Sequence, residues 1–256
     1  MNSTLKISIV TATFNCVDFV QTCLDSVASQ SYKHIEHILI DGDSSDGTKE
    51  LLRSKQCNSC TVLIEPDTGI YDAMNKGIEL ASGDVVGFLN SDDFYVDDFV
   101  IEKVAEIFSN NDSLGICYAN LEYVSRYDSS NVVRFWKSEK FQPGFFSKGW
   151  CPPHPTFFVR RSLFEAHGRY DLNFRIAADV DLMMRFTEVF NIESRYVDDL
   201  WVRMRLGGTT NKSIKNIVIQ NLEVISALKK YKLYVNLPRF IFGKVFSRCA
   251  QFVKKD

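Results

Sequence analysis

The sequence predicts an α/β fold, a mainly parallel sheet flanked by helices, that ends in a basic helical C-terminal extension. In the first 108 residues, short β-branched runs alternate with helical segments, an order that implies right-handed crossovers and a parallel sheet. Polar residues follow each of four strand-like runs. The charge is also divided along the chain, because residues 1–206 carry 20 basic and 30 acidic side chains, whereas the residues from Gly207 onward carry ten and two.

The composition excludes two other classes of protein. The chain has 256 residues, a net charge of -2, 45% hydrophobic and 24% charged residues, which is a globular mixture and not that of a disordered chain. No uninterrupted apolar run of about 18 residues exists, which argues against a membrane-spanning bundle. Seven cysteines and the lack of a charged and apolar leader after Met1 lead us to expect a reducing, cytoplasmic setting.

Hydrophobic periodicity predicts the elements of the first half. Residues 6–11 are a β-branched run typical of a buried parallel strand, and Asn15 is placed to cap the following helix, whose apolar residues recur at helical spacing from Val17 to Val27. A turn-and-cap cluster at 41–48 opens the next helix. Further strands are predicted at 35–40, 61–65 and 84–89, and further helices at 70–80 and 97–108.

The second half is less regular. Residues 114–124 and 131–137 are predicted to be strands added to the sheet in a mixed arrangement, and residues 141–155, rich in Gly, Pro and aromatic residues, to be a loop. Residues 182–190 are predicted to be helical. From Ile214 the chain mixes apolar stripes with lysines, which predicts amphipathic helices. We therefore expect residues 1–210 to form the α/β domain and residues 211–256 to form a basic amphipathic tail.

The carboxyl ends of the four strands of the first half carry the candidate chemistry, because ligands of open α/β sheets bind there. Carboxylates or amides follow every strand, in the runs Thr11–Asn15, Asp41–Asp43, Glu65–Gly69 and Asn90–Asp93. The chain has neither the glycine-rich dinucleotide fingerprint nor the phosphate-binding loop with its Gly-Lys pair, which argues against those two phosphate-binding sites.

Asp92 and Asp93 form the sharpest of these features. Adjacent carboxylates after an apolar strand repel unless a cation or hydrogen bonds neutralise them. Mg²⁺ and Mn²⁺ prefer oxygen ligands, and they often take only one or two from the protein while substrate phosphates supply others. The alternative interpretation is a helix cap with a solvated charge before Asp97, since acidic residues are usual at helix starts.

Four motifs in this order resemble those of family 2 glycosyltransferases of the GT-A fold, in particular bacterial enzymes that build O-antigen, capsule and colanic-acid repeat units. The motifs are the first strand with Thr13-Phe14-Asn15, then the runs at 41–48, 65–77 and 88–93. The resemblance covers roughly residues 5–210. It implies inverting transfer of a sugar from a nucleotide-sugar, for which we predict a UDP-sugar, with Mn²⁺ or Mg²⁺ on the diphosphate.

The resemblance also implies roles for individual residues. Asp41 would accept from the uracil N–H, and Asp92 would bind the metal, with Asn90 in place of the family's first acid. His154, between two prolines, would lie beside the sugar and acceptor, although a lone His among apolar residues also fits a structural role. The full set of implied donor-binding residues is Thr11, Thr13, Asn15, Asp41, Asp67, Lys76, Ser91, Asp93, His154, Arg203 and Arg205.

The catalytic base implied by the resemblance is Asp179. The run 175–185 matches the family's Glu-Asp motif with Ala178 in place of Glu, and an inverting displacement needs a carboxylate that removes the acceptor hydroxyl proton. Only position in the motif separates Asp179 from Asp181, and capping of the helix predicted at 182–190 is the alternative role for Asp179. Arg203, Arg205 and the run 207–210 form a candidate flap over the diphosphate, with Leu206 where many relatives have a metal-binding His.

The expected partners are a nucleotide-sugar donor and a polyprenyl-diphosphate-linked saccharide acceptor, and no nucleic acid. Two interpretations of the basic tail are open: an amphipathic helix on anionic lipid, which would make the protein peripheral on the inner face of the cytoplasmic membrane, or a helix packed on the acidic body. Two other functions also remain to be weighed. A nucleotidyltransferase would need a basic, glycine-rich first loop, which 11–15 lacks, and a non-catalytic nucleotide-sugar-binding or scaffold protein would keep the fold without turnover.

Overall fold

A computed structural model describes residues 4–54, 60–207 and 213–252 of the chain. In this part, nine strands form one sheet in the order β3-β2-β1-β4-β8-β6-β9-β5, with β7 paired to β6. The strands are β1 (Ile7–Thr13), β2 (Ile35–Asp41), β3 (Cys60–Ile64), β4 (Val85–Phe88), β5 (Phe94–Tyr95), β6 (Ile116–Val124), β7 (Val132–Trp136), β8 (Phe158–Arg160) and β9 (Ser194–Arg205).

Helices and short helical turns connect these strands. The helices are α1 (Val17–Ala28), α2 (Thr48–Ser54), α3 (Ile70–Leu80), α4 (Val100–Ser109), α5 (Arg161–His167), α6 (Ala178–Met184), α7 (Ile214–Lys230) and α8 (Leu237–Ala250). The 3₁₀ turns are η1 (Phe146–Lys148) and η2 (His154–Thr156), and η3 (Arg185–Val189) is a π-helical turn.

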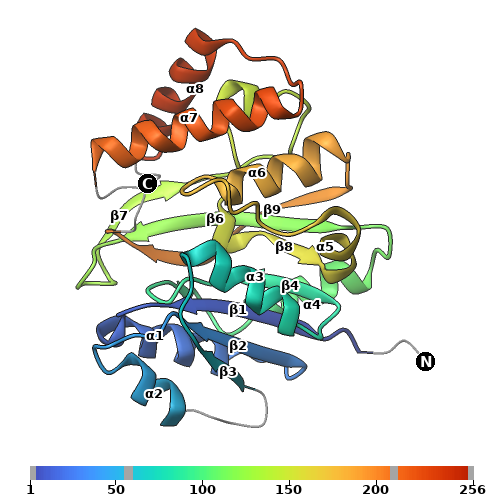
Figure 1. The fold of residues 1–256 in the computed structure, drawn as a ribbon. Coiled ribbons are helices and arrows are strands. Elements are labelled where there is room, and N and C mark those ends of the chain that lie inside the picture. Colours follow the sequence, from blue (N-terminus) through green and yellow to red (C-terminus); the bar gives the residue numbers. More distant parts are fainter. Residues whose placement is uncertain (1–3, 55–59, 208–212, 253–256) are drawn as a thin grey trace.

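The first four strands confirm the predicted parallel arrangement. β1 pairs in parallel with β2 and β4, and β2 with β3. Alternate residues of β1 enter opposite cores, since Val10 and Ala12 pack with α3 and Ile7 and Ile9 pack with α1 and α4. Helices therefore cover both faces of the sheet (Figure 1), and the ends of these strands lie at one edge.

The rest of the sheet is mixed, as predicted, but three of its strands, β5, β8 and β9, were not predicted. β8 pairs antiparallel with both β4 and β6, and β9 pairs parallel with β6 and antiparallel with β5. β9 carries charged residues that hid its strand character, and these charges find partners in the fold: Asp199 pairs with Lys103, Asp198 with Lys137 and Arg203 with Glu122.

Two local predictions were wrong. Asn15 does not cap α1, because it has a left-handed backbone with φ of 47° and its Oδ1 accepts the N–H of Ser45 instead. Asp46 accepts the Val17 N–H at the start of α1. The helix predicted at 182–190 begins earlier, at Ala178, and widens into the π-helical turn η3, so Asp179 lies in its first turn and not before it.

The tail helices pack on the far side of α6, at the end of the molecule opposite β3 (Figure 1). Val224, Ala227 and Leu228 of α7 and Phe240 of α8 are buried in the same core as α3 and α6. The boundary between residues 210 and 211 stays a prediction. No helix among the residues that the structure describes is long and apolar enough to cross a membrane.

Candidate functional site

The ends of β1 and β2 form a tight polar cluster. Asp41 is wholly buried, and its carboxylate accepts the Thr13 hydroxyl at 2.8 Å and both the N–H and the hydroxyl of Ser44, at 2.8 and 2.7 Å. Contact between Asp41 and a nucleotide base would therefore require its neighbours to move. Asn15, by contrast, is exposed beside this cluster, where its own N–H donates to the Ser44 hydroxyl at 2.8 Å.

Thr11 lies deeper than the other candidates. Its side chain is fully buried, and its hydroxyl lies 2.9 Å from Nε2 of His37. Burial lowers the pKa of His37 to about 4, so this pair is a neutral contact inside the sheet. The structure thus brings Thr13 and Asn15 to the edge but leaves Thr11 in the core.

The end of β3 approaches the end of β2 through Asp67. A side chain at Gly42 would meet Oδ2 of Asp67 at 2.5 Å and the ring of Phe14 at 3.2 Å, so glycine is what allows these three residues to close together. Burial raises the pKa of Asp67. Lys76 pairs with Glu65 at 2.8 Å and donates to the carbonyl of Pro66 at 2.9 Å, which fixes the loop before α3.

The two acids after β4 have different environments. Asp93 is fully buried, accepts from Nδ2 of Asn90 at 2.8 Å and from the N–H of Arg205 at 3.2 Å. Burial and then the charge of Asp92 raise the pKa of Asp93 well above its usual range. Asp92 is partly exposed, so it is the carboxylate of the pair that a ligand can reach.

The cation beside Asp92 was not predicted. Nη1 of Arg126 lies 4.0 Å from Oδ2 of Asp92, and the Arg126 guanidinium stacks 4.4 Å from the ring of Phe19. Arg205, which we expected on the donor diphosphate, is buried and donates to the carbonyl of Asp92 at 2.9 Å. Arg203 pairs with Glu122 on β6. Residues 208–210 of the candidate flap lie outside the described residues.

A divalent cation fits this end of β4 only if the donor supplies most of its ligands. Among the residues that the structure describes, no group of three His, Cys, Asp or Glu side chains could hold a metal ion. One carboxylate, Asp92, with phosphate oxygens and water completing the shell, is a donor set that suits Mg²⁺ or Mn²⁺. Ser91 lies near this acid and bonds to Cys16 at the start of α1.

The structure separates Asp179 from Asp181. Oδ1 of Asp179, at the start of α6, accepts the Tyr71 hydroxyl at 3.0 Å, and the Asp179 side chain is partly exposed. Asp181 is fully buried, accepts the Tyr231 hydroxyl at 2.8 Å and has a raised pKa because of burial. A solvent-accessible carboxylate can exchange a proton with a substrate, whereas Asp181 is enclosed by the tail.

His154 lies beside Asp179. Nε2 of His154 is 2.7 Å from the Tyr170 hydroxyl, and its ring stacks on Phe88 with centroids 5.3 Å apart. Burial lowers the pKa of His154, and the charge of Asp179 opposes that shift. His154 is therefore a buried neutral group that orders the aromatic wall next to the carboxylate.

The structure thus leaves two carboxylates partly exposed, Asp92 after β4 and Asp179 at the start of α6. The family model for glycosyl transferase family 2 matches residues 8–168. The chain belongs to glycosyltransferase family 2. This family membership confirms the expected fold and transferase class.

One curated relative and two solved structures are similar to this glycosyltransferase. A PGL/p-HBAD biosynthesis glycosyltransferase of Mycobacterium bovis is 29% identical over 245 residues, which is 94% of this chain and 92% of the relative. TarS of S. aureus, residues 1–349, superposes with a TM-score of 0.66 at 16% identity over 98% of this chain and 76% of TarS. The mannosyltransferase PcManGT of Pyrobaculum calidifontis, solved with GDP-Man and Mn²⁺, superposes with a TM-score of 0.64 at 16% identity over 97% of this chain and 74% of PcManGT. The structural neighbours are GT-A glycosyltransferases.

Sequence reasoning missed several residues of this glycosyltransferase's candidate site. Tyr71 stood inside the motif at 65–77 but had no assigned role. Tyr170, Arg126 and Glu223 carry no local signal, because their contacts span tens of residues. The Glu223 carboxylate on α7 accepts the N–H groups of residues 175, 176 and 177 at 3.1, 2.8 and 2.9 Å, so the tail supports the start of α6.

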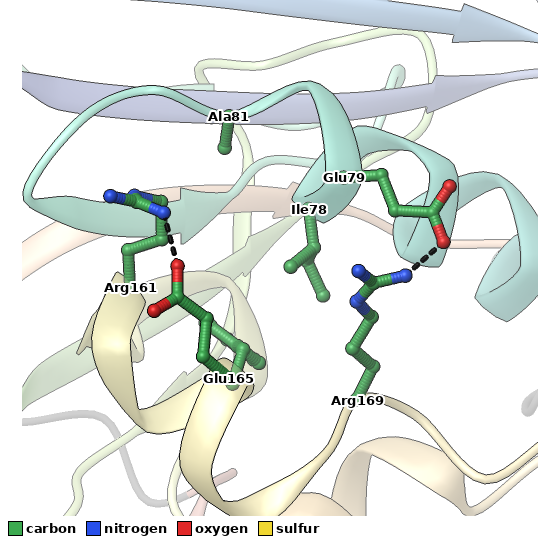
Figure 2. Close-up of a pocket in the computed structure, with 7 residues that line it drawn as sticks. Ile78, Glu79, Ala81, Arg161, Glu165 and Arg169 are labelled. Atoms are coloured by element: carbon green, nitrogen blue, oxygen red, sulfur yellow. Dashed lines mark hydrogen bonds and ion pairs between the residues drawn. The ribbon is translucent and has the colours of Figure 1, made fainter.

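A small cavity lies elsewhere on the molecule (Figure 2). It has a volume of about 100 Å³ and lies between the end of α3 and α5. Ion pairs of Arg161 with Glu165 and of Arg169 with Glu79 line it. Its wall includes Ala81, which precedes β4, whereas Asp92 follows β4, so the cavity lies toward the opposite end of the strand from Asp92.

Proposed function

We propose that this chain is an inverting glycosyltransferase that transfers a sugar from a UDP-sugar to a polyprenyl-diphosphate-linked saccharide in bacterial surface-polysaccharide assembly, with Mn²⁺ or Mg²⁺. The observation that carries the proposal is the pair of accessible carboxylates, Asp92 after β4 and Asp179 at the start of α6. Two related structures support the donor class, since TarS was solved with UDP-GlcNAc and PcManGT with GDP-Man and Mn²⁺.

The chemistry assigned to Asp179 is general base catalysis. Its carboxylate accepts the proton of an acceptor hydroxyl while that oxygen forms a bond to the anomeric carbon of the donor. The bond from the anomeric carbon to the diphosphate oxygen breaks, and its electron pair leaves on the nucleoside diphosphate. Attack from the face opposite the leaving group inverts the anomeric configuration. A positioned base of this kind typically contributes 10²–10⁴-fold.

Tyr71 orients the proposed base. Its hydroxyl lies 3.0 Å from Oδ1 of Asp179 and 2.9 Å from the carbonyl of Ile176, and its ring stacks on Tyr170 with centroids 5.5 Å apart. Tyr71 lies in the first turn of α3, directly after the loop that carries Asp67. A conformational change of the donor loop would therefore move the group that holds the base.

The proposed roles at the leaving group belong to Asp92 and Arg126. A divalent cation held by Asp92 would neutralise the charge that develops on the departing diphosphate. The Arg126 guanidinium, 4.0 Å from Asp92, supplies charge-assisted hydrogen bonds to phosphate oxygens. Thr13, Asn15 and Asp67 are the strand-end residues proposed for the nucleoside.

Measurement of nucleoside diphosphate release from a panel of UDP- and GDP-sugars, with and without Mn²⁺, tests this proposal. We expect release that depends on the metal, and its loss in Asp92→Asn by about 10²-fold or more because a single protein carboxylate holds the cation. Thr187→Val, a buried position away from the strand ends, is the control for general damage. Binding of a nucleotide-sugar without turnover across a broad acceptor panel would instead identify a scaffold.

The outward side of α8 is proposed to contact a membrane surface rich in anionic lipid. Large apolar side chains are exposed along it, with Phe242 at 71% and Phe246 at 66%. The tail that carries them has ten basic and two acidic residues, and apolar area together with excess positive charge favours anionic bilayers.

Co-sedimentation with phosphatidylglycerol vesicles tests the contact. We expect binding that weakens with salt and falls strongly in the double variant Phe242→Ser and Phe246→Ser, while donor hydrolysis in solution stays unchanged. Vesicle binding that is the same for the double variant and the native chain would exclude this surface.

A further inference from the structure

The turn between β6 and β7 lies beside the end of β9 and carries Arg126. Within the turn, the Asp128 carboxylate accepts the N–H and the hydroxyl of Ser130 at 3.0 and 2.6 Å. The Leu206 N–H, just after β9, donates to the carbonyl of Val124 at 3.0 Å. Arg126 therefore comes from a turn of defined shape that is joined to the segment after β9.

Three segments surround the Arg126 guanidinium. The Phe19 ring of α1 lies 4.4 Å from it, and the face of an aromatic ring attracts a positive charge. Oδ2 of Asp92, after β4, lies 4.0 Å from Nη1. A side chain at Gly207, where φ is 116°, would lie 2.8 Å from the same Nη1, so glycine lets the chain after β9 approach the guanidinium closely. These contacts hold the cation beside the Asp92 carboxylate.

The side chains of Arg126 and Asp92 can exchange partners while the loop after β4 stays in place. They are 38% and 26% exposed, and an ion pair that water reaches is weak. The backbone of Asp92 is fixed, because Nη1 of Arg205 donates to its carbonyl at 2.9 Å and the Arg205 guanidinium stacks 4.7 Å from the Phe94 ring. A ligand can therefore separate the ion pair without moving the strand end.

A divalent cation and Arg126 compete for the Asp92 carboxylate. A cation on Oδ2 and a guanidinium 4.0 Å from the same oxygen carry charges of one sign, and like charges at such short range repel. A nucleoside diphosphate removes the conflict, because its phosphate oxygens are ligands for Mg²⁺ or Mn²⁺ and also accept charge-assisted hydrogen bonds from arginine. We therefore expect the free cation to bind poorly and the cation with its nucleotide to bind well.

We propose that Arg126 is an exchangeable counter-ion of Asp92 and that the site takes up the divalent cation and the nucleoside diphosphate as one complex, a proposal that rests on the function proposed above. As the complex binds, Asp92 exchanges Arg126 for the cation, and the guanidinium turns to the diphosphate oxygens. When the nucleoside diphosphate leaves after sugar transfer, Arg126 pairs with Asp92 again, which favours release of the cation together with the product. Arg126 thus selects against the free metal ion.

A purely structural role for Arg126 predicts a different result. If the guanidinium only packed the turn on Phe19, its loss would loosen the turn and weaken the binding of both ligands. Competition for Asp92 predicts opposite changes, with tighter binding of the free cation and weaker binding of the nucleotide. The two ligands must therefore be measured separately.

Electron paramagnetic resonance of Mn²⁺, in which the signal of the free ion falls on binding, tests the competition in the full chain without nucleotide. We expect the Mn²⁺ dissociation constant of Arg126→Gln to be about tenfold lower than that of the native chain, because a like charge has been removed. Arg126→Lys keeps the charge and should bind Mn²⁺ as weakly as the native chain does. Arg195→Gln is the matched control, since it removes the same charge at an exposed position at the end of β9 far from Asp92.

Calorimetry with UDP in saturating Mn²⁺ tests the transfer of Arg126 to the diphosphate. Arg126→Gln should raise the UDP dissociation constant about tenfold, because a charge-assisted hydrogen bond to phosphate is lost. Arg195→Gln should bind both Mn²⁺ and UDP as the native chain does.

The outcomes separate this proposal from the function on which it rests. Failure of UDP with Mn²⁺ to bind to the native chain would reject the proposed function itself. If UDP and Mn²⁺ bind together, equal Mn²⁺ affinity of the native chain and Arg126→Gln, including no measurable binding by either, would reject the competition alone. Weaker binding of both ligands by Arg126→Gln would assign Arg126 a structural role, and an unchanged UDP affinity would reject its transfer to the diphosphate.

Discussion

The proposed donor side and the proposed acceptor side of the site are built in different ways. On the donor side, Thr13 and Asp41 are the last residues of β1 and β2, and Asp92 lies in the loop just after β4. On the acceptor side, Asp179 is held by Tyr71, 108 residues earlier in the chain, and its helix is supported by Glu223 from α7. The comparison teaches that the donor side is positioned by strand geometry, whereas the acceptor side depends on packing between distant segments.

The largest effect is expected from the exchange of the base. Asp179→Asn removes the proton acceptor, so kcat should fall about 10²–10⁴-fold, while the donor dissociation constant stays the same. Asp181→Asn is the matched control, because Asp181 is buried beneath Tyr231, and its kcat should stay within about threefold of the native value. Single-turnover kinetics with calorimetry measure both quantities. Undiminished activity of Asp179→Asn would show that another residue is the base.

The contact between α8 and η1, at Gly243 and Lys148, gives the next test of the comparison. Gly243→Ala places a Cβ against the Lys148 carbonyl, where 1.9 Å is available, so α8 must shift, at a cost of about 3 kcal/mol in unfolding free energy. Urea unfolding measures the loss, and limited proteolysis reports whether α8 has separated. Ser226→Ala on the exposed side of α7 is the control. Unchanged stability would mean that the tail does not support the acceptor side.

Glu223 tests whether the tail positions the base. In Glu223→Gln a neutral amide replaces the carboxylate that accepts three backbone N–H groups, which should cost about 2 kcal/mol of stability. We expect kcat to fall with the donor KM unchanged, because α6 shifts while the strand ends do not. Glu106→Gln, exposed on α4, should change neither quantity. A rise in the donor KM would show that the two sides are not independent.

The smallest effect on stability is expected at the amino-terminal ends of the strands, where Glu36 lies near the start of β2. Burial raises the pKa of Glu36, but bonds from Lys6, Ser8 and Ser82 outweigh it and bring the pKa down to about 2. Because the folded pKa lies below the unfolded value, this stabilisation is present above about pH 4.5 and is lost as the pH falls toward 2. Glu36→Gln should lower stability by about 1 kcal/mol at pH 7, after screening at the exposed Lys6.

Thermal unfolding of both proteins from pH 7 to pH 3 checks the prediction for Glu36. The difference between them should shrink steadily as the pH falls, and kinetic constants at pH 7 should be equal. A difference that does not depend on pH would assign the stabilisation to packing and not to the charge.

The sequence predicted the donor side because its signals are local. A short β-branched run bounded by turn residues is typical of a buried strand, and the polar residues at or after its end then lie at the edge of the sheet, as Thr13 and Asp92 do. The strand character of β9 was hidden, because Asp198, Asp199 and Arg203 look incompatible with a sheet until Lys137, Lys103 and Glu122 neutralise them. Each of those pairs joins residues at least 61 positions apart, which no local pattern reveals.

The same distinction explains the errors at single residues. Asparagine is a common helix cap, but the side chain of Asn15 accepts the N–H of Ser45 instead. Asp46 takes the capping position and accepts the N–H of Val17 at the start of α1. Only position in the motif favoured Asp179 over Asp181 in the sequence, because the burial of Asp181 by Tyr231, 50 residues away, leaves no local pattern. The role of Arg126 depends on where β6 ends relative to Asp92, which the order of residues does not specify.

The contact of Gly243 with the Lys148 carbonyl has a consequence for how this protein can diversify. The joint that holds α8 in place uses backbone atoms and the inward face, so the outward side chains Ile241, Phe242, Val245 and Phe246 take no part in it. Those positions can be substituted, in evolution or by design, without disturbing the packing of α8 on η1. Substitutions on the exposed face of α8 can therefore change what that face contacts while the packing of the helix on the rest of the molecule stays the same.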